Sequence, residues 1–100
     1  MKELNEKVVM WASNKGIFHG STALKQLDKL QEEVNELDEE LFNENGEKAK
    51  DELGDCLVVL TVIAEFLGTT PEECLQRAYD KISKRKGKMV GGVFVKEEDL

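Results

Sequence analysis

Two pairs of acidic residues occur in the sequence with the same spacing. Glu33 and Glu36 form the first pair, and Glu52 and Asp55 form the second. Residues three apart in an α-helix lie on the same side of it, so each pair would present two carboxylates together. If the two segments are neighbouring helices, four carboxylates converge, and their repulsion requires a counter-ion. Carboxylate oxygens are typical ligands of hard divalent cations, and we predict Mg²⁺ at this position, with Mn²⁺ as a substitute.

Either pair alone is weak evidence, because the charged face of a surface helix produces the same spacing by chance. The two pairs together are stronger evidence. They share one spacing, each lies beside a seam of apolar residues, and a single turn separates them, which would lay the two helices antiparallel. We therefore favour a metal site over a solvated acidic surface.

The hydrophobic pattern predicts the helices that must position these acids. A first helix is expected over residues 2–15, where Leu4, Val8 and Trp11 recur at helical spacing before Gly16. Residues beyond this glycine would form a short apolar connection folded back on the domain.

A second helix is predicted from an N-cap at Ser21 or Thr22 to about residue 42. A turn over residues 43–46 leads to a third helix over about residues 47–67. The second half of this third helix is apolar on almost every side, which predicts a central helix with neighbours all round. The second helix carries a narrow apolar seam for packing, formed by Leu27, Leu30, Val34, Leu37 and Leu41.

A fourth helix has the clearest start signal in the chain. Thr70 is the expected N-cap, Pro71 occupies the first helical position, and Glu73 is the capping-box glutamate. The residues of this helix that we expect to face inward are Leu75, Ala78 and Ile82.

The end of the chain changes character. Residues 89–95 predict either a short hairpin around Gly91 and Gly92 or an extended tail docked on the helices. The predicted fold is therefore all-α, a four-helix bundle-like chain with this tail, forming a single domain over residues 1–100. Because a chain of 100 residues buries a limited fraction of its surface, we expect a homodimer or homotetramer.

The composition narrows the class of protein. Hydrophobic residues make up 40% of the chain, which favours a folded domain over a disordered acidic one. The net charge of −7 argues against binding to nucleic acid or anionic membranes. Neither a leader peptide nor a long apolar run is evident, so we expect a cytoplasmic protein. Cys56 and Cys74 are expected to be reduced core thiols.

The acidic segments also carry a resemblance to a known family. Glu32, Glu33 and Glu36, followed by Glu52 and Asp55, resemble the signature of the MazG-like nucleoside triphosphate pyrophosphohydrolases. The resemblance covers most of the chain, and its ending is similar to short single-domain members, including those of phage type. It implies a helical protein that forms dimers or dimers of dimers. It also implies magnesium-dependent cleavage of a nucleoside triphosphate to the monophosphate and pyrophosphate.

By this resemblance Glu33, Glu36, Glu52 and Asp55 correspond to the metal ligands. Glu32 corresponds to the remaining acid of the motif, with a supporting or water-orienting role. Carboxylates cannot bind a triphosphate directly, so Mg²⁺ would bridge the acids and the phosphate oxygens. A motif carboxylate that is free of metal, either Glu32 or Glu36, would accept a proton from the attacking water.

Several charged residues are candidates for substrate contacts. Lys29 lies on the acidic side of the second helix and would pair with Glu33 or reach phosphate. Asp80 matches a position that lies near the nucleotide in relatives. A solvated helix end is an equally good interpretation of the remaining candidates, which are Lys81, Lys84, Arg85 and Lys88.

Two further side chains are candidates for contacts to the nucleobase. Trp11 fits the apolar stripe of the first helix, so core packing is the favoured interpretation and base stacking the alternative. His19 lies in a loop beside a glycine, and we favour a solvent-facing position over a substrate contact. Neither residue identifies the base.

Two alternative functions remain open at this point. In the first, the chain is a non-catalytic helical oligomerisation or interaction protein whose acids are solvated. In the second, the metal site is retained but the substrate is a nucleoside diphosphate or a modified nucleotide. Identifying the products separates this second alternative from the preferred function, because the preferred function releases pyrophosphate and the alternative would release orthophosphate.

Overall fold

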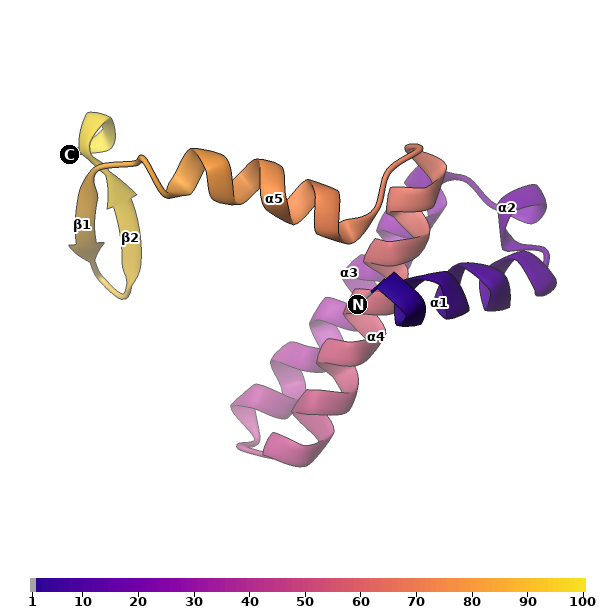
Figure 1. The fold of residues 1–100 in the computed structure, drawn as a ribbon. Helices are drawn as coiled ribbons and strands as arrows, with labels where there is room; N and C mark the ends of the chain where they lie inside the picture. The colour runs from indigo at the N-terminus through magenta and orange to yellow at the C-terminus, as the bar shows by residue number, and fades with distance from the viewer. Residues whose placement is uncertain (1) are drawn as a thin grey trace.

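The computed structural model describes residues 2–100 and is mostly helical, which confirms the predicted helical class. A two-stranded hairpin and a short 3₁₀ helix follow the helices, as Figure 1 shows. The elements in chain order are α1 (Lys2–Asn14), α2 (Ile17–Gly20), α3 (Ala23–Phe42), α4 (Gly46–Phe66), α5 (Pro71–Ile82), β1 (Gly87–Val90), β2 (Val93–Lys96) and η1 (Glu97–Asp99).

The α3–α4 pair is the structural centre of the chain, and its two helices run antiparallel and side by side (Figure 1). Each helix begins with a side-chain cap. The hydroxyl of Thr22 accepts a hydrogen bond from the Lys25 amide at 3.1 Å, and the Asn45 side chain accepts one from the Lys48 amide at 3.2 Å. The turn between the helices contains Glu44 with a φ of 56°. This tight connection forces the two helices to pack along their length.

The core is built mainly on α4, but the neighbours predicted all round this helix are not found in the described chain, because Leu53, Leu57 and Leu60 are each at least 43% exposed. Ala12 of α1 is completely buried against this helix. The predicted connection after Gly16 is the one-turn helix α2, and its Phe18 packs edge-on against Phe66, with ring centroids 5.2 Å apart. The buried apolar residues of α4 are Ala49, Cys56, Val59, Val62 and Ala64.

Helix α5 leaves α4 at a bend of 93° and projects away from the other helices as an arm (Figure 1). Its start follows the predicted signal, because the Thr70 hydroxyl accepts a hydrogen bond from the Glu73 amide at 3.1 Å. The predicted inward stripe is wrong. Leu75 is 71% exposed and Ile82 is 53% exposed, since only the start of the arm contacts another helix.

The arm ends in the hairpin, which confirms the first of the two predictions for this segment. Strands β1 and β2 pair antiparallel, with Val90 opposite Val93 and Gly87 opposite Lys96. Gly91 and Gly92 form the turn with φ values of 58° and 87°. Two successive positive φ values characterise the type I′ turn, which matches the twist of a hairpin and favours glycine.

The chain is more extended than a closed helical bundle. Its radius of gyration is 16.1 Å, whereas about 13 Å is typical of a 100-residue domain. Only Cys56 of the two cysteines is buried. Cys74 lies exposed on α5, contrary to the expectation of a core thiol, and both thiols are free. No single helix within residues 2–100 is long and apolar enough for a membrane span, although α4 and α5 together, across their bend, meet those criteria.

Candidate metal centre

Three carboxylates converge between α3 and α4. Oxygens of Glu33, Glu36 and Glu52 all lie within 4.8 Å of one another. Glu33 is only 8% exposed, Glu52 is half-buried and Glu36 is exposed, so the cluster is open on one side. Two oxygens of the cluster, Oε2 of Glu33 and Oε2 of Glu52, are buried and have no hydrogen-bond partner among the described residues. A buried carboxylate oxygen without a partner is costly, so this geometry is suited to a cation.

Helix geometry explains why these acids meet. Glu33 and Glu36 are three residues apart on α3 and therefore point to the same side of that helix. Glu52 lies in the second turn of α4, on the same face as the buried Val59. The short antiparallel connection aligns the two faces, so the acid of α4 lies opposite the acid pair of α3.

The electrostatics of the cluster reflect this crowding. The pKa of Glu52 is raised from 4.5 to about 7, mostly by burial and further by a hydrogen bond with Glu36 and by the negative charges of Glu36, Asp55 and Glu33. Burial and the same acids also raise the pKa of the neighbouring Cys56 thiol. Without a metal ion, Glu52 therefore holds a proton near neutral pH. A divalent cation would displace this proton.

Lys29 neutralises one edge of the cluster. Its Nζ lies 3.3 Å from Glu32 Oε2 and 3.3 Å from Glu33 Oε1. Hydrogen bonds to Glu32 and Glu33, in that order, raise the pKa of this lysine. Glu32 is not among the three converging carboxylates, and its side chain is 68% exposed. Three of the five motif acids therefore converge, whereas Glu32 pairs with Lys29.

A cavity of about 410 Å³ opens beside the acids. Asp55, the fourth predicted ligand, is exposed and lines this cavity together with Glu33, rather than joining the three converging carboxylates. Trp11 also lines this cavity and is 48% exposed, so the favoured interpretation of Trp11 as a core residue was wrong. The remaining lining residues are Ile17, Gln26, Lys29, Val58, Val59 and Val62.

Gln26 is a cavity residue that was not predicted from the sequence. Its Nε2 donates a hydrogen bond to the Ser21 hydroxyl at 3.1 Å, which fixes the amide at the cavity wall. The spacing of Gln26, Lys29 and Glu33 on one face of α3 was the available signal. The apolar residues of α4 that line the cavity could not have been distinguished from core residues by sequence.

The other predicted substrate residues lie elsewhere. His19 is exposed on α2 and lines neither the cavity beside the acids nor any other described cavity. Asp80 accepts a hydrogen bond from Gln76 Nε2 at 2.9 Å on the outer part of α5. Lys88 is exposed on β1. The three remaining basic candidates line a second cavity at the end of the arm; they are Lys81, Lys84 and Arg85.

Comparison with known proteins agrees with this acidic geometry. Residues 21–90, which contain the three converging acids, match the MazG nucleotide pyrophosphohydrolase domain. An uncharacterized 18.2 kDa protein of Haemophilus phage HP1, encoded in the rep-hol intergenic region, is 32% identical over 65 residues. That match covers 65% of this chain and 40% of the phage protein, so the chain spans well under half of that relative. No solved structure gives a significant match. Because the domain match extends over more than half of the chain, this protein belongs to the MazG nucleotide pyrophosphohydrolase family.

Proposed function

We propose that the chain is a Mg²⁺-dependent pyrophosphohydrolase that cleaves a ribo- or deoxyribonucleoside triphosphate to the monophosphate and pyrophosphate. The family in general is associated with pyrophosphohydrolase activity and divalent metals. The observation that carries the proposal is the pair of buried, unpartnered oxygens of Glu33 and Glu52 within the three-carboxylate cluster. Such an enzyme would act on cytoplasmic nucleotide pools, either to adjust them or to remove aberrant nucleotides.

The donor set of the cluster fits a hard cation. Glu33, Glu36 and Glu52 supply converging carboxylate oxygens, and Asp55 lies near enough to Glu52 to raise its pKa and is available as a fourth ligand. When bound, divalent metal supplies Lewis-acid chemistry, polarising phosphate oxygens and lowering the pKa of water. Manganese would satisfy the same oxygen ligands.

The proton of the attacking water must pass to a group on the chain. Glu36 is the exposed member of the cluster, so its carboxylate can face both water and substrate. Glu32 is the second candidate, but its carboxylate is already paired with Lys29. We therefore assign proton acceptance to Glu36 first, and a water-orienting role to Glu32 together with Lys29.

The cavity beside the acids is suited to the nucleoside. Its lining includes the acids Glu33 and Asp55 and the half-exposed indole of Trp11. An aromatic face at that position can stack on a base, and the Gln26 amide can hydrogen-bond to the edge of the base. We propose that Trp11 and Gln26 position the base while the phosphates extend toward the carboxylates. We propose that His19 and Asp80 contact only the outer parts of the substrate.

We further propose that the single-domain chain acts as a homo-oligomer. Exposed leucines at positions 53, 57 and 60 form an apolar stripe on α4, and each is at least 43% exposed. A second apolar stripe lies on α3 and consists of Leu27, Val34 and Leu41, each of which is also at least 43% exposed. Uncovered stripes on the two central helices are typical of a helix–helix interface.

A panel of common ribo- and deoxyribonucleoside triphosphates, each with and without Mg²⁺, tests the proposed reaction. We expect metal-dependent release of monophosphate and pyrophosphate. Release of orthophosphate, or turnover of nucleoside diphosphates alone, would instead favour the alternative function, a metal-dependent hydrolase of nucleoside diphosphates or modified nucleotides. No turnover and no heat of magnesium binding would leave the interaction-protein function as the better one.

A further inference from the structure

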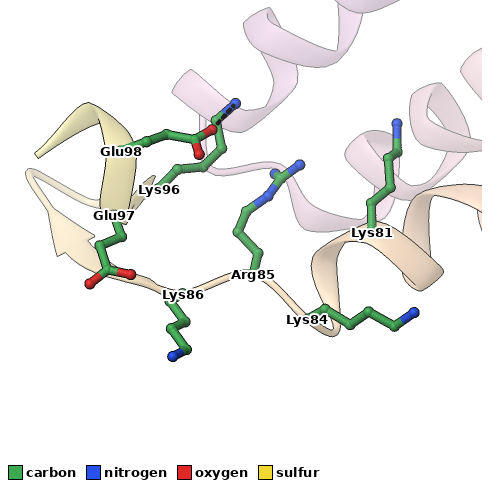
Figure 2. Close-up of a pocket in the computed structure, with 7 residues that line it drawn as sticks. All are labelled: Lys81, Lys84, Arg85, Lys86, Lys96, Glu97 and Glu98. Carbon is green, nitrogen blue, oxygen red and sulfur yellow. Dashed lines mark ion pairs between the residues drawn. The ribbon is translucent and has the colours of Figure 1, made fainter.

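Two cavities of the chain differ in the groups that they offer to a ligand. The basic cavity, at the end of the arm, has a volume of about 480 Å³, and Figure 2 shows its lining, in which every side chain is charged, among them Lys81, Arg85 and Lys96. The cavity beside the acids contains one neutral side chain with both a hydrogen-bond donor and an acceptor, the amide of Gln26. Such a planar amide is suited to read the edge of a nucleobase.

The NH₂ end of this amide is held by Ser21. Nε2 of Gln26 donates a hydrogen bond to Ser21 Oγ at 3.1 Å. The Ser21 hydroxyl has a single hydrogen, which it donates to the Thr22 carbonyl at 3.5 Å, so its oxygen acts as an acceptor toward Gln26. Turning the amide over would place two acceptors against each other. The hydrogen bonds of Ser21 therefore set the orientation of the Gln26 amide.

The carbonyl end of the amide is the end that a ligand can reach. Ser21 does not line the cavity beside the acids, whereas Gln26 does, so the end turned away from Ser21 lies at the cavity wall. Gln26 is half-buried, yet among residues 2–100 the buried side-chain oxygens without a partner belong only to Glu33 and Glu52. Oε1 of Gln26 is therefore an accessible acceptor at the wall of this cavity.

The distance between Gln26 and the acids matches a nucleotide. Gln26 and Glu33 are two helical turns apart on α3, so they lie on one face at a separation of about 10.5 Å along the axis. A nucleotide spans a similar length from its phosphates to the edge of its base. When the phosphates lie at the acids, the base reaches Gln26 and the indole of Trp11, which lines the same cavity.

An acceptor at this wall discriminates between bases. Cytosine and adenine carry an exocyclic amino group, which donates, where uracil, thymine and hypoxanthine carry a carbonyl oxygen, which only accepts. The amino group can hydrogen-bond to Oε1 of Gln26. A carbonyl at the same place would leave two facing acceptors desolvated and unpaired. The amide cannot turn to relieve this without losing its hydrogen bond to Ser21.

We propose that Gln26 selects nucleotides whose base is cytosine or adenine, and that Ser21 is the positioning residue that directs the Gln26 carbonyl toward the base. This inference rests on the proposed function and adds the substrate class to it. We expect kcat/KM to be at least about tenfold higher for CTP than for UTP, and for ATP than for ITP, because the second nucleotide of each pair leaves acceptors unpaired.

The same two nucleotide pairs, measured on variants, test the assignment. Gln26→Leu removes the acceptor and should bring both ratios close to one. Ser21→Ala keeps the amide but allows it to turn, so both ratios should fall while kcat for CTP changes little. Gln26→Glu restores an acceptor and should retain the preference, although its charge lowers the affinity for every nucleotide. A purely structural role of Gln26 would not give this pattern.

A matched control lies on the same helix. Gln31 is exposed on α3 and lines none of the described cavities, so Gln31→Leu should keep both ratios at the wild-type values. Circular dichroism must show that each variant folds. Equal kcat/KM values within the pairs in the wild-type protein, a preference for UTP over CTP, or a preference that survives in Gln26→Leu would overturn the inference.

Equilibrium binding separates this inference from the proposed function. We expect the α,β-methylene analogue of CTP, with Mg²⁺, to bind the wild-type protein at least about tenfold more tightly than the analogue of UTP. If this preference is found but no nucleotide is hydrolysed, the proposed function fails and the base selection stands. If all four nucleotides are hydrolysed equally well, the function stands and the base selection fails. No binding of either analogue would refute both.

Discussion

The acidic centre lies on two helices that pack along their whole length, whereas the basic cavity lies on an arm that contacts the other helices only at its start. Glu33 is buried and its unpaired oxygen is held by the core, while every cationic side chain of the arm reaches solvent. The difference follows from the chemistry of each region. Carboxylates must be fixed close together to select a small cation, whereas flexible lysines and arginines can adapt to a phosphate chain.

The largest expected effect comes from removing an acid of the cluster. Glu52→Gln should lower the turnover of nucleoside triphosphates at least about 100-fold. Removing a residue that only hydrogen-bonds to a metal ligand costs about 10- to 100-fold in activity, and this change removes a predicted ligand itself. Above about pH 7, where Glu52 loses its proton, the metal-free variant should melt at a higher temperature than the metal-free wild-type protein, because the substitution removes a charge from a crowded cluster. Glu33→Gln should behave in the same way. Steady-state kinetics and thermal unfolding measure the two effects.

A matched control is available on the same helix. Glu65 is an exposed acid of α4 outside the cluster, so Glu65→Gln should leave both turnover and the metal-free melting temperature close to the wild-type values. Full activity in Glu52→Gln would remove the basis for placing the metal between α3 and α4.

The second effect concerns the wall of the cavity beside the acids. Trp11→Ala should raise the KM for nucleoside triphosphates about tenfold with little change in kcat, because stacking of a base on an aromatic ring contributes about 1–3 kcal/mol. Trp11→Phe should retain most of the affinity. Met10→Ala is the control, since Met10 is an exposed apolar neighbour that does not line this cavity. An unchanged KM in Trp11→Ala would exclude the indole from base binding.

The sequence predicts a feature of these two regions when that feature depends only on residues close together in the chain. The capping signal at Thr70 and the spacing of Glu33 and Glu36 depend on helix geometry alone, and the short turn between α3 and α4 then brings Glu52 beside that pair. The pattern of Leu75 and Ile82 also predicts an apolar face correctly. It does not predict what covers that face, which depends on tertiary contacts that the arm lacks.

The basic cavity shows the same limit. Lys96 joins Lys86 only because the hairpin register places Gly87 opposite Lys96. The sequence offered a hairpin and a tail as equal alternatives, and no local rule chose between them. Trp11 was likewise assigned to the core because its spacing matches a buried stripe, whereas α1 crosses α4 at a position that leaves the indole at a cavity wall.

The third prediction uses the raised pKa of Glu52. In the folded, metal-free protein this pKa is about 7, against an ordinary value of 4.5, so the folded state holds more protons than the unfolded state between these values. Stability should therefore fall as the pH rises from about 4.5 to about 7, and this contribution should level off above that range. Thermal unfolding of the wild-type protein minus that of Glu52→Gln isolates the contribution.

Magnesium should reverse the sign of this pH dependence. Mg²⁺ competes with the proton at Glu52, so the affinity of the protein for Mg²⁺ should increase as the pH rises toward 7. Saturating Mg²⁺ should therefore remove the loss of stability at neutral pH. Identical pH profiles for the wild-type protein and Glu52→Gln would contradict the assignment of the raised pKa to this carboxyl group.

The smallest effects come from a matched pair of glycine substitutions, one in each region. Gly54 lies inside α4, and a Cβ added there would meet nothing within 4 Å, so Gly54→Ala should stabilise the chain by about 0.5–1 kcal/mol. Gly92 has a φ of +87°, so Gly92→Ala strains the hairpin turn by about 1–2 kcal/mol. The first change should raise the melting temperature by several degrees. The second should leave it unchanged and increase amide hydrogen exchange in β1 and β2, because the hairpin lies on the arm. A lower melting temperature for Gly54→Ala would contradict this expectation and would mean that the backbone of another chain approaches α4 beside the acids. A lower melting temperature for Gly92→Ala would mean that the hairpin is covered in the assembly.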